Sequence, residues 1–201
     1  MLNTTDWTDF CLNDLFEISA GKYYYADEYE NGNTPYITAS AINNGIAKRI
    51  NLQPDFKGNA ITTGKVGCTA FYQKEAFCAT SDVNIFVAEK FKMTPNIGVF
   101  ITSIINFSEN YKWTYGRQCR QQNSKRIIIK LPKALDVNGN PLLDKDSNYN
   151  SHGYVPDFQF MEDYMANILN VNENSSIGST LQTKNISSNQ KLETSHWQEF
   201  C

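Results

Sequence analysis

Four short runs of strand-forming residues dominate the amino-terminal half of the chain, and each is bounded by Gly, Asn, Asp or Pro. The runs cover residues 36–38, 60–62, 68–72 and 83–87. β-Branched and aromatic residues in such short runs, separated by turn-forming residues, are typical of strands joined by tight connections. Residues 10–20 precede the runs and are expected to form one helical turn that leads into a strand ending at Gly21. The first half of the chain is therefore predicted to be β-rich.

Two helices and a further strand are expected in the second half. Apolar residues recur at spacings of three and four from Asn96 to Phe107, which predicts a helix with one buried stripe, and Pro95 suits its first turn. Residues 126–131 contain three consecutive isoleucines, a pattern that predicts a strand covered on both faces. A second helix is expected to begin at Pro156-Asp157, with Asp157 as its cap.

The 201 residues are enough for one sizeable core and too few for two ordinary domains. Residues 132–156 are rich in Pro, Asn, Asp and Gly and are expected to form a long loop. The pattern W-x-[DE]-F-C occurs at residues 7–11 and again at 197–201, which predicts the start of a second copy of the same unit. We therefore expect a domain at 1–155, a connecting helix at 156–170, a polar linker at 171–194 and a repeated segment at 195–201.

Composition and cysteine use exclude several classes of protein. The chain is 41% hydrophobic and 19% charged, as in folded globular proteins. No apolar run approaches the roughly 18 residues of a membrane span, and the first residues lack the features of a signal peptide, so a cytoplasmic protein without a membrane partner is expected. The five cysteines are odd in number and never follow C-x-x-C spacing, which indicates reduced thiols rather than disulfides or a zinc site.

Motifs for catalysis are missing from the sequence. Gly21-Lys22 and Gly64-Lys65 lack the frame of a phosphate-binding loop, and the only histidines, His152 and His196, form no H-E-x-x-H pair. The sequence contains no glycine-rich cofactor fingerprint and no N-P-P-[YF]-type tetrad of an amino-methyltransferase. We therefore expect no catalytic residue, no metal site and no cofactor.

The distribution of charge is more informative than its sum. The net charge is −3 and the pI about 5.4, which gives no general attraction to nucleic acid. No acid occurs between Glu109 and Asp136, however, and this window contains Lys112, Arg117, Arg120, Lys125, Arg126, Lys130 and Lys133. Residues 117–123 (RQCRQQN) combine two guanidinium groups with four side-chain amides, the groups that contact phosphates and base edges. The alternative is a solvated polar loop whose arginines pair with the acidic amino-terminal segment.

Two other segments carry weaker signals of nucleic-acid contact. Residues 21–25 (GKYYY) place a lysine beside three tyrosines, a combination that suits phosphate contact and stacking. Residues 38–45 (TASAINNG) contain short polar side chains that can reach groove edges. Each segment has an ordinary alternative, because tyrosine runs are often half-buried in strands and Asn43-Asn44-Gly45 is a turn signal.

Taken in order, these features resemble the target-recognition domain of type I restriction-modification specificity subunits and the related subunits of type IIB systems. The resemblance extends from residue 7 to about residue 169. Its motifs are Trp7…Phe10…Leu12…Leu15-Phe16, Gly21-Lys22, Pro35-Tyr36-Ile37-Thr38, Asn43-Asn44-Gly45-Ile46, Gly58-Asn59-Ala60-Ile61-Thr62, Phe77…Thr80-Ser81-Asp82-Val83, Tyr115-Gly116-Arg117-Gln118, Ile129-Lys130-Leu131-Pro132 and Gly153…Pro156-Asp157…Phe160-Met161-Glu162. The last motif is especially similar to the type IIB branch.

The resemblance implies a compact α+β domain whose curved, mostly antiparallel sheet presents loops to DNA, followed by one carboxy-terminal helix. It implies a non-catalytic DNA specificity subunit that directs a methyltransferase subunit and an endonuclease subunit to double-stranded DNA. The residues expected to contact DNA are Lys22, Tyr23, Ser40, Asn43, Lys65, Tyr72, Lys74, Arg117, Arg120 and Gln121. A homodimer is expected to form through the helix, at Phe158, Met161, Met165 and Ile168.

The chain departs from the family pattern, because a specificity subunit of this kind contains two recognition domains and one is expected here. A natural half-subunit, a truncated reading frame and a designed fragment all remain open. A different function also remains open, namely a non-catalytic carbohydrate- or protein-binding β-rich module. That module would use the tyrosines for stacking and would show no salt-dependent affinity for duplex DNA.

Overall fold

The computed structural model describes residues 4–168. The expected linker at 171–194 and the repeated segment at 195–201 lie outside the described residues. One compact unit extends from Met1 to Met165, and the remaining residues form a second unit. The boundary expected at residue 155 therefore does not separate compact units, because the first part of the connecting helix packs into the core of the domain.

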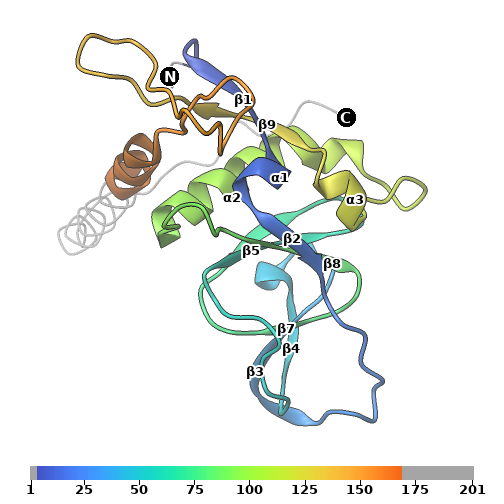
Figure 1. The fold of residues 1–201 in the computed structure, drawn as a ribbon. Coiled ribbons are helices and arrows are strands. Elements are labelled where there is room, and N and C mark those ends of the chain that lie inside the picture. The colour runs from blue at the N-terminus through green and yellow to red at the C-terminus, as the bar shows by residue number, and fades with distance from the viewer. Residues whose placement is uncertain (1–3, 169–201) are drawn as a thin grey trace, which may run out of the picture. The chain divides into compact units, whose positions relative to one another are not determined.

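The central sheet has four antiparallel strands in the order β2-β8-β5-β6. These strands are β2 (Glu17–Ala20), β8 (Val83–Val87), β5 (Ala60–Gly64) and β6 (Ala70–Gln73). Helix α2 (Pro95–Glu109) packs against β5 and β6 (Figure 1). Its first turn follows the sequence-based prediction, since Pro95 opens the helix and the backbone N–H of Ile97 donates to Thr94 Oγ1 at 3.2 Å.

A second sheet of three strands lies at one end of the domain, and we call it the distal sheet (Figure 1). It consists of β4 (Ile46–Ile50), β3 (Asn31–Ile37) and β7 (Cys78–Ala79), of which β3 and β7 are parallel. A small apolar cluster of Tyr36, Ile50 and Cys78 supports it. The short 3₁₀ helix η1 (Asn43–Gly45) connects β3 to β4.

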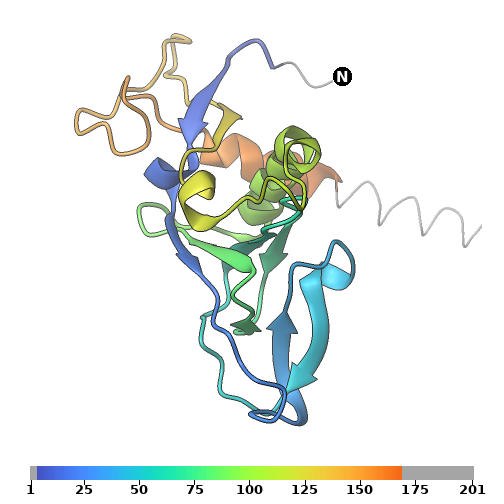
Figure 2. The same ribbon diagram turned by 90° about the vertical axis from the view of Figure 1, so that its right-hand side faces the viewer.

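The opposite end of the domain contains a two-stranded antiparallel sheet of β1 (Trp7–Cys11) and β9 (Ile128–Pro132). Helix α1 (Leu12–Leu15) joins β1 to the central sheet. Two short helical segments, η2 (Asn110–Lys112) and α3 (Gln121–Ser124), follow α2 in the chain and precede β9; α3 is the short yellow helix in Figure 2. Pro132 ends β9, and the rest of the loop expected at 132–156 contains isolated bridges but no strand or helix.

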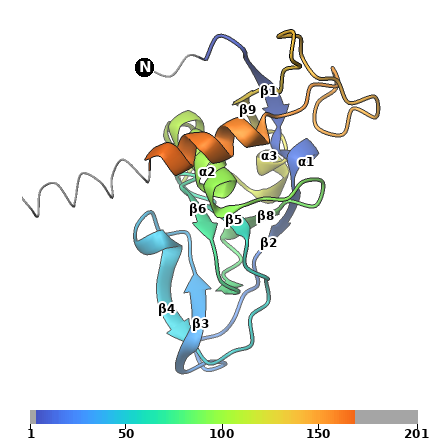
Figure 3. The ribbon, with the colours of Figure 1, turned by 90° about the vertical axis from the view of Figure 1, so that its left-hand side faces the viewer.

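The last helix covers residues 158–168, and its residues up to 165 lie against α2 (Figure 3). Asp157 caps it as predicted, because Asp157 Oδ1 accepts from the backbone N–H of Phe160 at 2.8 Å. Phe158 stacks on Phe91 with ring centroids 4.3 Å apart, and Met161 is fully buried in the core. The part of this helix up to residue 165 therefore belongs to the domain.

The predicted α+β class with mostly antiparallel strands is confirmed, although the strands divide among three small sheets. One detail was wrong: the strand at 126–131 is not covered on both faces. It begins at Ile128, and the side chain pattern alternates, with Ile127 and Ile129 buried and Ile128 57% exposed. The reason is that β9 pairs with β1 in a two-stranded sheet, so one face packs on the core and the other meets solvent. Within residues 4–168, no helix has the length and apolar character of a membrane span.

Candidate nucleic-acid interface

The basic window forms an ordered loop, residues 113–120, which we call the arginine loop. Two backbone hydrogen bonds hold it on the turn after β5, and a side chain of β8 holds it from below. The N–H of Gly67 donates to the carbonyl of Trp113 at 3.2 Å, and the N–H of Cys119 donates to the carbonyl of Lys65 at 2.7 Å. The buried amide of Asn84 donates to the carbonyl of Cys119 at 2.8 Å. Because its backbone is fixed in this way, the loop presents its arginines in defined places.

The arginines of this region have no carboxylate partner within residues 4–168. Arg117 lies over the ring of Trp113, with the guanidinium carbon 5.3 Å from the ring centroid. Arg120 donates from Nε to Gln118 Oε1 at 3.3 Å. Neither these residues nor Arg126 forms an ion pair in the described part of the chain. The alternative in which they pair with the acidic amino-terminal segment is therefore wrong for these residues.

A buried carboxylate organises the start of the arginine loop. Glu109 is the last residue of α2, and its side chain is 4% exposed. Glu109 Oε1 accepts from Lys112 Nζ at 2.7 Å, and Oε2 accepts from the indole N–H of Trp113 at 2.9 Å. The hydrogen bond to Glu109 raises the pKa of Lys112, so the ammonium group of Lys112 stays charged near neutral pH.

Two thiols meet beneath the arginine loop. Cys68 donates to Cys119 with a distance of 3.6 Å between the sulfur atoms, and both residues are fully buried. The hydrogen bond to Cys119 and, to a smaller extent, burial raise the pKa of Cys68. Cys68 is therefore neutral in the folded chain, and the two thiols contribute packing and a weak hydrogen bond.

The second group of candidates lies beside the distal sheet, where the charge of Lys22 is compensated. Lys22 Nζ forms an ion pair with Asp55 Oδ1 at 2.5 Å, and the hydroxyl of Tyr24 donates to Asp55 Oδ2 at the same distance. Burial raises the pKa of Asp55, but the hydrogen bonds from Lys22 and Tyr24 outweigh it, so that this pKa is below its ordinary value. Tyr23 is exposed and stands edge-on to Tyr25.

Ser40 and Asn43 lie in the turn that leads into β4, and their polar groups bond within that turn. The side-chain amide of Asn43 donates to the carbonyl of Ile46 at 2.8 Å, and Ser40 Oγ accepts from the N–H of Ile42 at 3.3 Å. Asn43 has φ 51° and its neighbour Asn44 has φ 53°, a left-handed conformation that asparagine tolerates. These contacts bear out the expected turn signal.

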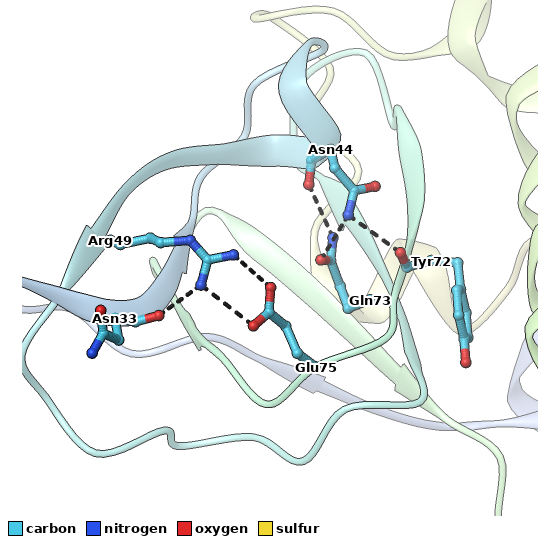
Figure 4. A network of polar contacts seen from close by, with 6 residues as sticks. All are labelled: Asn33, Asn44, Arg49, Tyr72, Gln73 and Glu75. Atoms are coloured by element: carbon cyan, nitrogen blue, oxygen red, sulfur yellow. Dashed lines mark hydrogen bonds and ion pairs between the residues drawn. The ribbon is translucent and has the colours of Figure 1, made fainter.

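Figure 4 shows how this turn and the hairpin of β3 and β4 are tied to the segment after β6. The Asn44 amide donates to Gln73 Oε1 at 3.0 Å, and the Gln73 amide donates back to the carbonyl of Asn44 at 3.0 Å. Arg49 binds the carboxylate of Glu75 with both terminal nitrogens and also donates to the carbonyl of Asn33. Glu75 and Asn33 therefore hold both terminal nitrogens of Arg49 within the chain.

Three further candidates are engaged inside the domain. Lys65 Nζ donates to the carbonyl of Ser81, and its side chain is only 18% exposed. The amide of Gln121 donates to the carbonyl of Ile18 at 2.8 Å. The hydroxyl of Tyr72 donates to Asn59 Oδ1 at 2.9 Å, with the ring against α2. These side chains hold strands and helices together and are poorly placed for direct base contact.

Lys74, the remaining candidate, is exposed on the segment after β6. The structure thus places Arg117, Arg120 and Gln121 together near α3, and Lys22 and Tyr23 where β2 leads toward the distal sheet (Figure 1). The ten candidates do not form one patch. The candidates predicted from the sequence did not include Arg126. The acid-free window contains Arg126 and was the signal that could have identified it.

The residues expected at a dimer interface differ in accessibility. Met161 is fully buried within its own chain and cannot contact a partner, which corrects that expectation. Phe158 and Met165 are partly buried against the core, and Ile168 is partly exposed. Glu162 fastens the helix to the start of α2, because its carboxylate accepts from Thr94 Oγ1 and, at 2.7 Å, from the Asn96 amide.

Comparisons with known proteins identify a family and proteins of similar fold. The family model for the type I restriction modification DNA specificity domain matches residues 4–139. The type II restriction enzyme BgcI specificity subunit S.BcgI of Heyndrickxia coagulans is 24% identical over 184 residues. That match covers 90% of this chain and 48% of the relative, so the chain spans about half the length of the curated relative it matches.

Solved structures with a similar fold include two specificity subunits. The S subunit of a type I restriction-modification system from M. genitalium has a TM-score of 0.52 at 16% identity, covering 89% of this chain and 44% of that chain. The HsdS subunit from Thermoanaerobacter tengcongensis has a TM-score of 0.53 at 11% identity, covering 93% of this chain and 42% of that chain. At these identities the similarity concerns the fold. Within residues 4–168, no group of three or more His, Cys, Asp or Glu side chains could hold a metal ion.

Proposed function

The chain belongs to the family of type I restriction modification DNA specificity domains, and we propose that it recognises a short sequence in double-stranded DNA. In this proposal it acts as the specificity subunit of a restriction-modification system, or as half of one. It carries no catalytic group of its own. A methyltransferase subunit, and an endonuclease subunit where the system cleaves, bind to it and modify the DNA that it selects.

One observation supports the proposal beyond family membership, namely the set of arginines without a carboxylate partner. The chain contains four arginines, and only Arg49 is ion-paired among the described residues. Arg117, Arg120 and Arg126 remain available, and all three lie in the acid-free window. A guanidinium group binds phosphate or the edge of guanine with two parallel hydrogen bonds. The net charge of −3 does not oppose this, because local rather than total charge steers a DNA strand.

The test compares the double variant Arg117→Ala/Arg120→Ala with the parent, both in complex with the methyltransferase subunit. Each lost phosphate contact should reduce the slope of log K against log salt by about 0.9, whereas each lost base contact should cost roughly 1–3 kcal/mol and relax one position. The control Lys92→Ala/Lys145→Ala removes two exposed charges elsewhere and should leave affinity and slope nearly unchanged. Parent-like binding and methylation by a folded arginine variant would refute the assignment to this loop.

The absence of catalysis is tested on the purified chain alone. Incubation with duplex DNA, Mg²⁺ and S-adenosylmethionine should leave the DNA neither methylated nor cut. Methyl transfer or cleavage that follows the chain through every purification step would contradict this part of the proposal.

We further propose that two chains pair through the exposed side of the helix at 158–168, so that the assembly reads a palindromic bipartite site. Met161 is excluded from this interface by its burial. Ile168→Glu should therefore shift light-scattering masses toward the monomer, while Met161→Glu should unfold the domain. A parent chain that stays monomeric at high concentration, both alone and with the methyltransferase, would remove the dimer and leave DNA recognition intact.

A further inference from the structure

A pocket opens between the end of α2, the arginine loop, α3 and the start of β9. Its volume is about 370 Å³. Trp113 and Ile128 form apolar parts of its lining, and Lys112, Arg117 and Arg126 bring three cations to it. Two of these cations, Arg117 and Arg126, are nine positions apart in sequence, and the fold brings both to the same concave surface.

The charge of the pocket is unbalanced in favour of an anion. Glu109 also lines it, but its carboxylate is buried and is occupied by Lys112 and by the indole of Trp113. The charges of Glu109 and Lys112 therefore cancel, and Arg117 and Arg126 have no counter-charge among the described residues. An anion that enters the pocket meets two guanidinium groups and no free carboxylate of the lining.

One of the two cations is already oriented. The guanidinium of Arg117 lies over the ring of Trp113, and its N–H groups have no hydrogen-bond partner among the described residues. The indole is held in turn by its hydrogen bond to Glu109. Arg117 therefore loses less side-chain freedom on binding an anion than a free surface arginine would.

The apolar part of the lining narrows the class of ligand. Ile128 is 57% exposed, although it lies in a strand between two buried isoleucines, and it lines this pocket. A ligand with an anionic group and an adjacent apolar face satisfies both the arginines and Ile128. The phosphate and deoxyribose of a DNA strand have this combination. Arg120 does not line the pocket and is exposed beside it, which suits a strand that continues beyond the pocket rather than a small ion.

We propose that this pocket holds one backbone phosphodiester of the bound DNA, with Arg117 and Arg126 donating to its non-bridging oxygens and the adjoining deoxyribose against Ile128. The inference rests on the proposed function and adds Arg126 and Ile128 to the interface. A backbone contact carries no sequence information, so the pocket fixes the position of the duplex relative to the residues that read bases.

The first experiment measures DNA binding by the complex with the methyltransferase subunit over a range of salt. Arg126→Ala should reduce the slope of log K against log salt by about 0.9, and it should weaken cognate and unrelated sequences equally. When the salt concentration rises fourfold, the affinity of the variant should therefore fall by a factor that is about 3.5 times smaller than the factor for the parent. Lys92→Ala is the control, because it removes a charge near the far end of α2, about 22 Å away along a 15-residue helix.

Ile128 offers a second variant pair that leaves the arginines in place. Ile128→Glu introduces a carboxylate beside the proposed phosphate, and Ile128→Gln introduces a neutral side chain of the same length. Because the residue is exposed, both variants should fold like the parent. Ile128→Glu should bind DNA at least tenfold more weakly than Ile128→Gln. Equal binding by the two variants would place the phosphate elsewhere.

Ethylation interference identifies the contact directly. In the parent complex, ethylation of one particular phosphate should weaken binding, and Arg126→Ala should lose sensitivity at that phosphate alone. If the Arg126→Ala complex stays sensitive to ethylation at every phosphate to which the parent complex is sensitive, while the parent still binds its sequence, the pocket assignment is wrong and the proposed function stands. If the parent complex shows no salt-dependent binding of duplex DNA, the proposed function itself fails.

A final arm separates a DNA strand from a free small anion. Inorganic phosphate and thymidine monophosphate are titrated against the chain while the indole N–H resonance of Trp113 is followed by NMR. Half-saturation above about 1 mM for both probes is expected of a site that depends on the rest of the strand. Micromolar binding of either probe would overturn the assignment to DNA and identify a site for a free phosphate or nucleotide.

Discussion

Replacing Gly98 by alanine sets two opposite effects against each other. Gly98 lies inside α2, where alanine is favoured over glycine by about 1 kcal/mol. A Cβ atom at this position, however, would come within 2.4 and 2.7 Å of two ring carbons of Tyr72. Carbon atoms in contact prefer a separation of about 3.5–4.0 Å, so the ring or the helix must move by about 1 Å.

The surroundings of Tyr72 make that movement costly. Its hydroxyl donates to Asn59 Oδ1, and the amide of Asn59 is itself fixed by donating to the carbonyl of Met93 at 2.9 Å. Overpacking of this kind costs about 1–3 kcal/mol, and loss of the tyrosine hydrogen bond adds about 1 kcal/mol. The steric effect therefore exceeds the gain in helix propensity, and Gly98→Ala is expected to destabilise the domain by about 1–3 kcal/mol.

Urea unfolding followed by circular dichroism measures the difference. The decisive comparison repeats Gly98→Ala in a Tyr72→Val background, where the ring is gone and the propensity gain of about 1 kcal/mol should appear as increased stability. Ser103→Ala, at an exposed position of the same helix, controls for propensity without a clash. If Gly98→Ala stabilises the otherwise unchanged chain, the reasoning about Tyr72 is refuted.

Two further predictions concern titration and thiol access. Asp55→Asn should lower the free energy of unfolding at neutral pH. Its difference from the parent should shrink as pH falls below about 4, because the pKa of Asp55 in the folded chain is below its ordinary value. Urea titrations between pH 7 and 3 check this, and a difference that stays constant with pH would contradict it. Iodoacetamide should alkylate the partly exposed Cys11 well before the buried Cys68 in the native protein, as peptide mass spectrometry can determine, and equal rates would contradict the burial of Cys68.

Local sequence information was sufficient for the elements whose determinants are neighbours in the chain. The helix at α2 was predicted from the spacing of its apolar residues and from Pro95, and Asp157 was identified as a cap from its position before an apolar stripe. Both features depend on contacts within a few residues. The helical turn at α1 and the strand at β8 followed from the same kind of local signal.

Elements defined by distant partners were missed or misread. Strand β4 contains Ala47, Lys48 and Arg49 and has no apolar run that would predict a strand. Its strand conformation is determined by pairing with β3. The three isoleucines before Lys130 suggested a strand covered on both faces, but β9 belongs to a two-stranded sheet with one face in solvent. Sequence alone does not say how many strands will flank a given run.

The same distinction between local and distant information applies to the site. The acid-free window identified Arg117 and Arg120 correctly as available cations, because no acid within reach along the chain could pair with them. The fate of Lys22 could not be read from its neighbours, since its partner Asp55 is 33 positions away. The partners of Lys65 and Gln121 could not be read from their neighbours either, because Lys65 contacts the carbonyl of Ser81 and Gln121 contacts the carbonyl of Ile18.

Charge pairing in the folded chain determines where a DNA strand can lie. Near the distal sheet, Lys22 pairs with Asp55 and Arg49 pairs with Glu75, so a phosphate there would have to displace a carboxylate. Exposed ion pairs contribute only about 0–1 kcal/mol, but a carboxylate that remains nearby still repels the phosphate. Lys130 of β9 pairs with Asp9, but Arg126 and the arginines of the loop have no such competitor among the described residues. The DNA backbone is therefore expected on the side of α3 and the arginine loop.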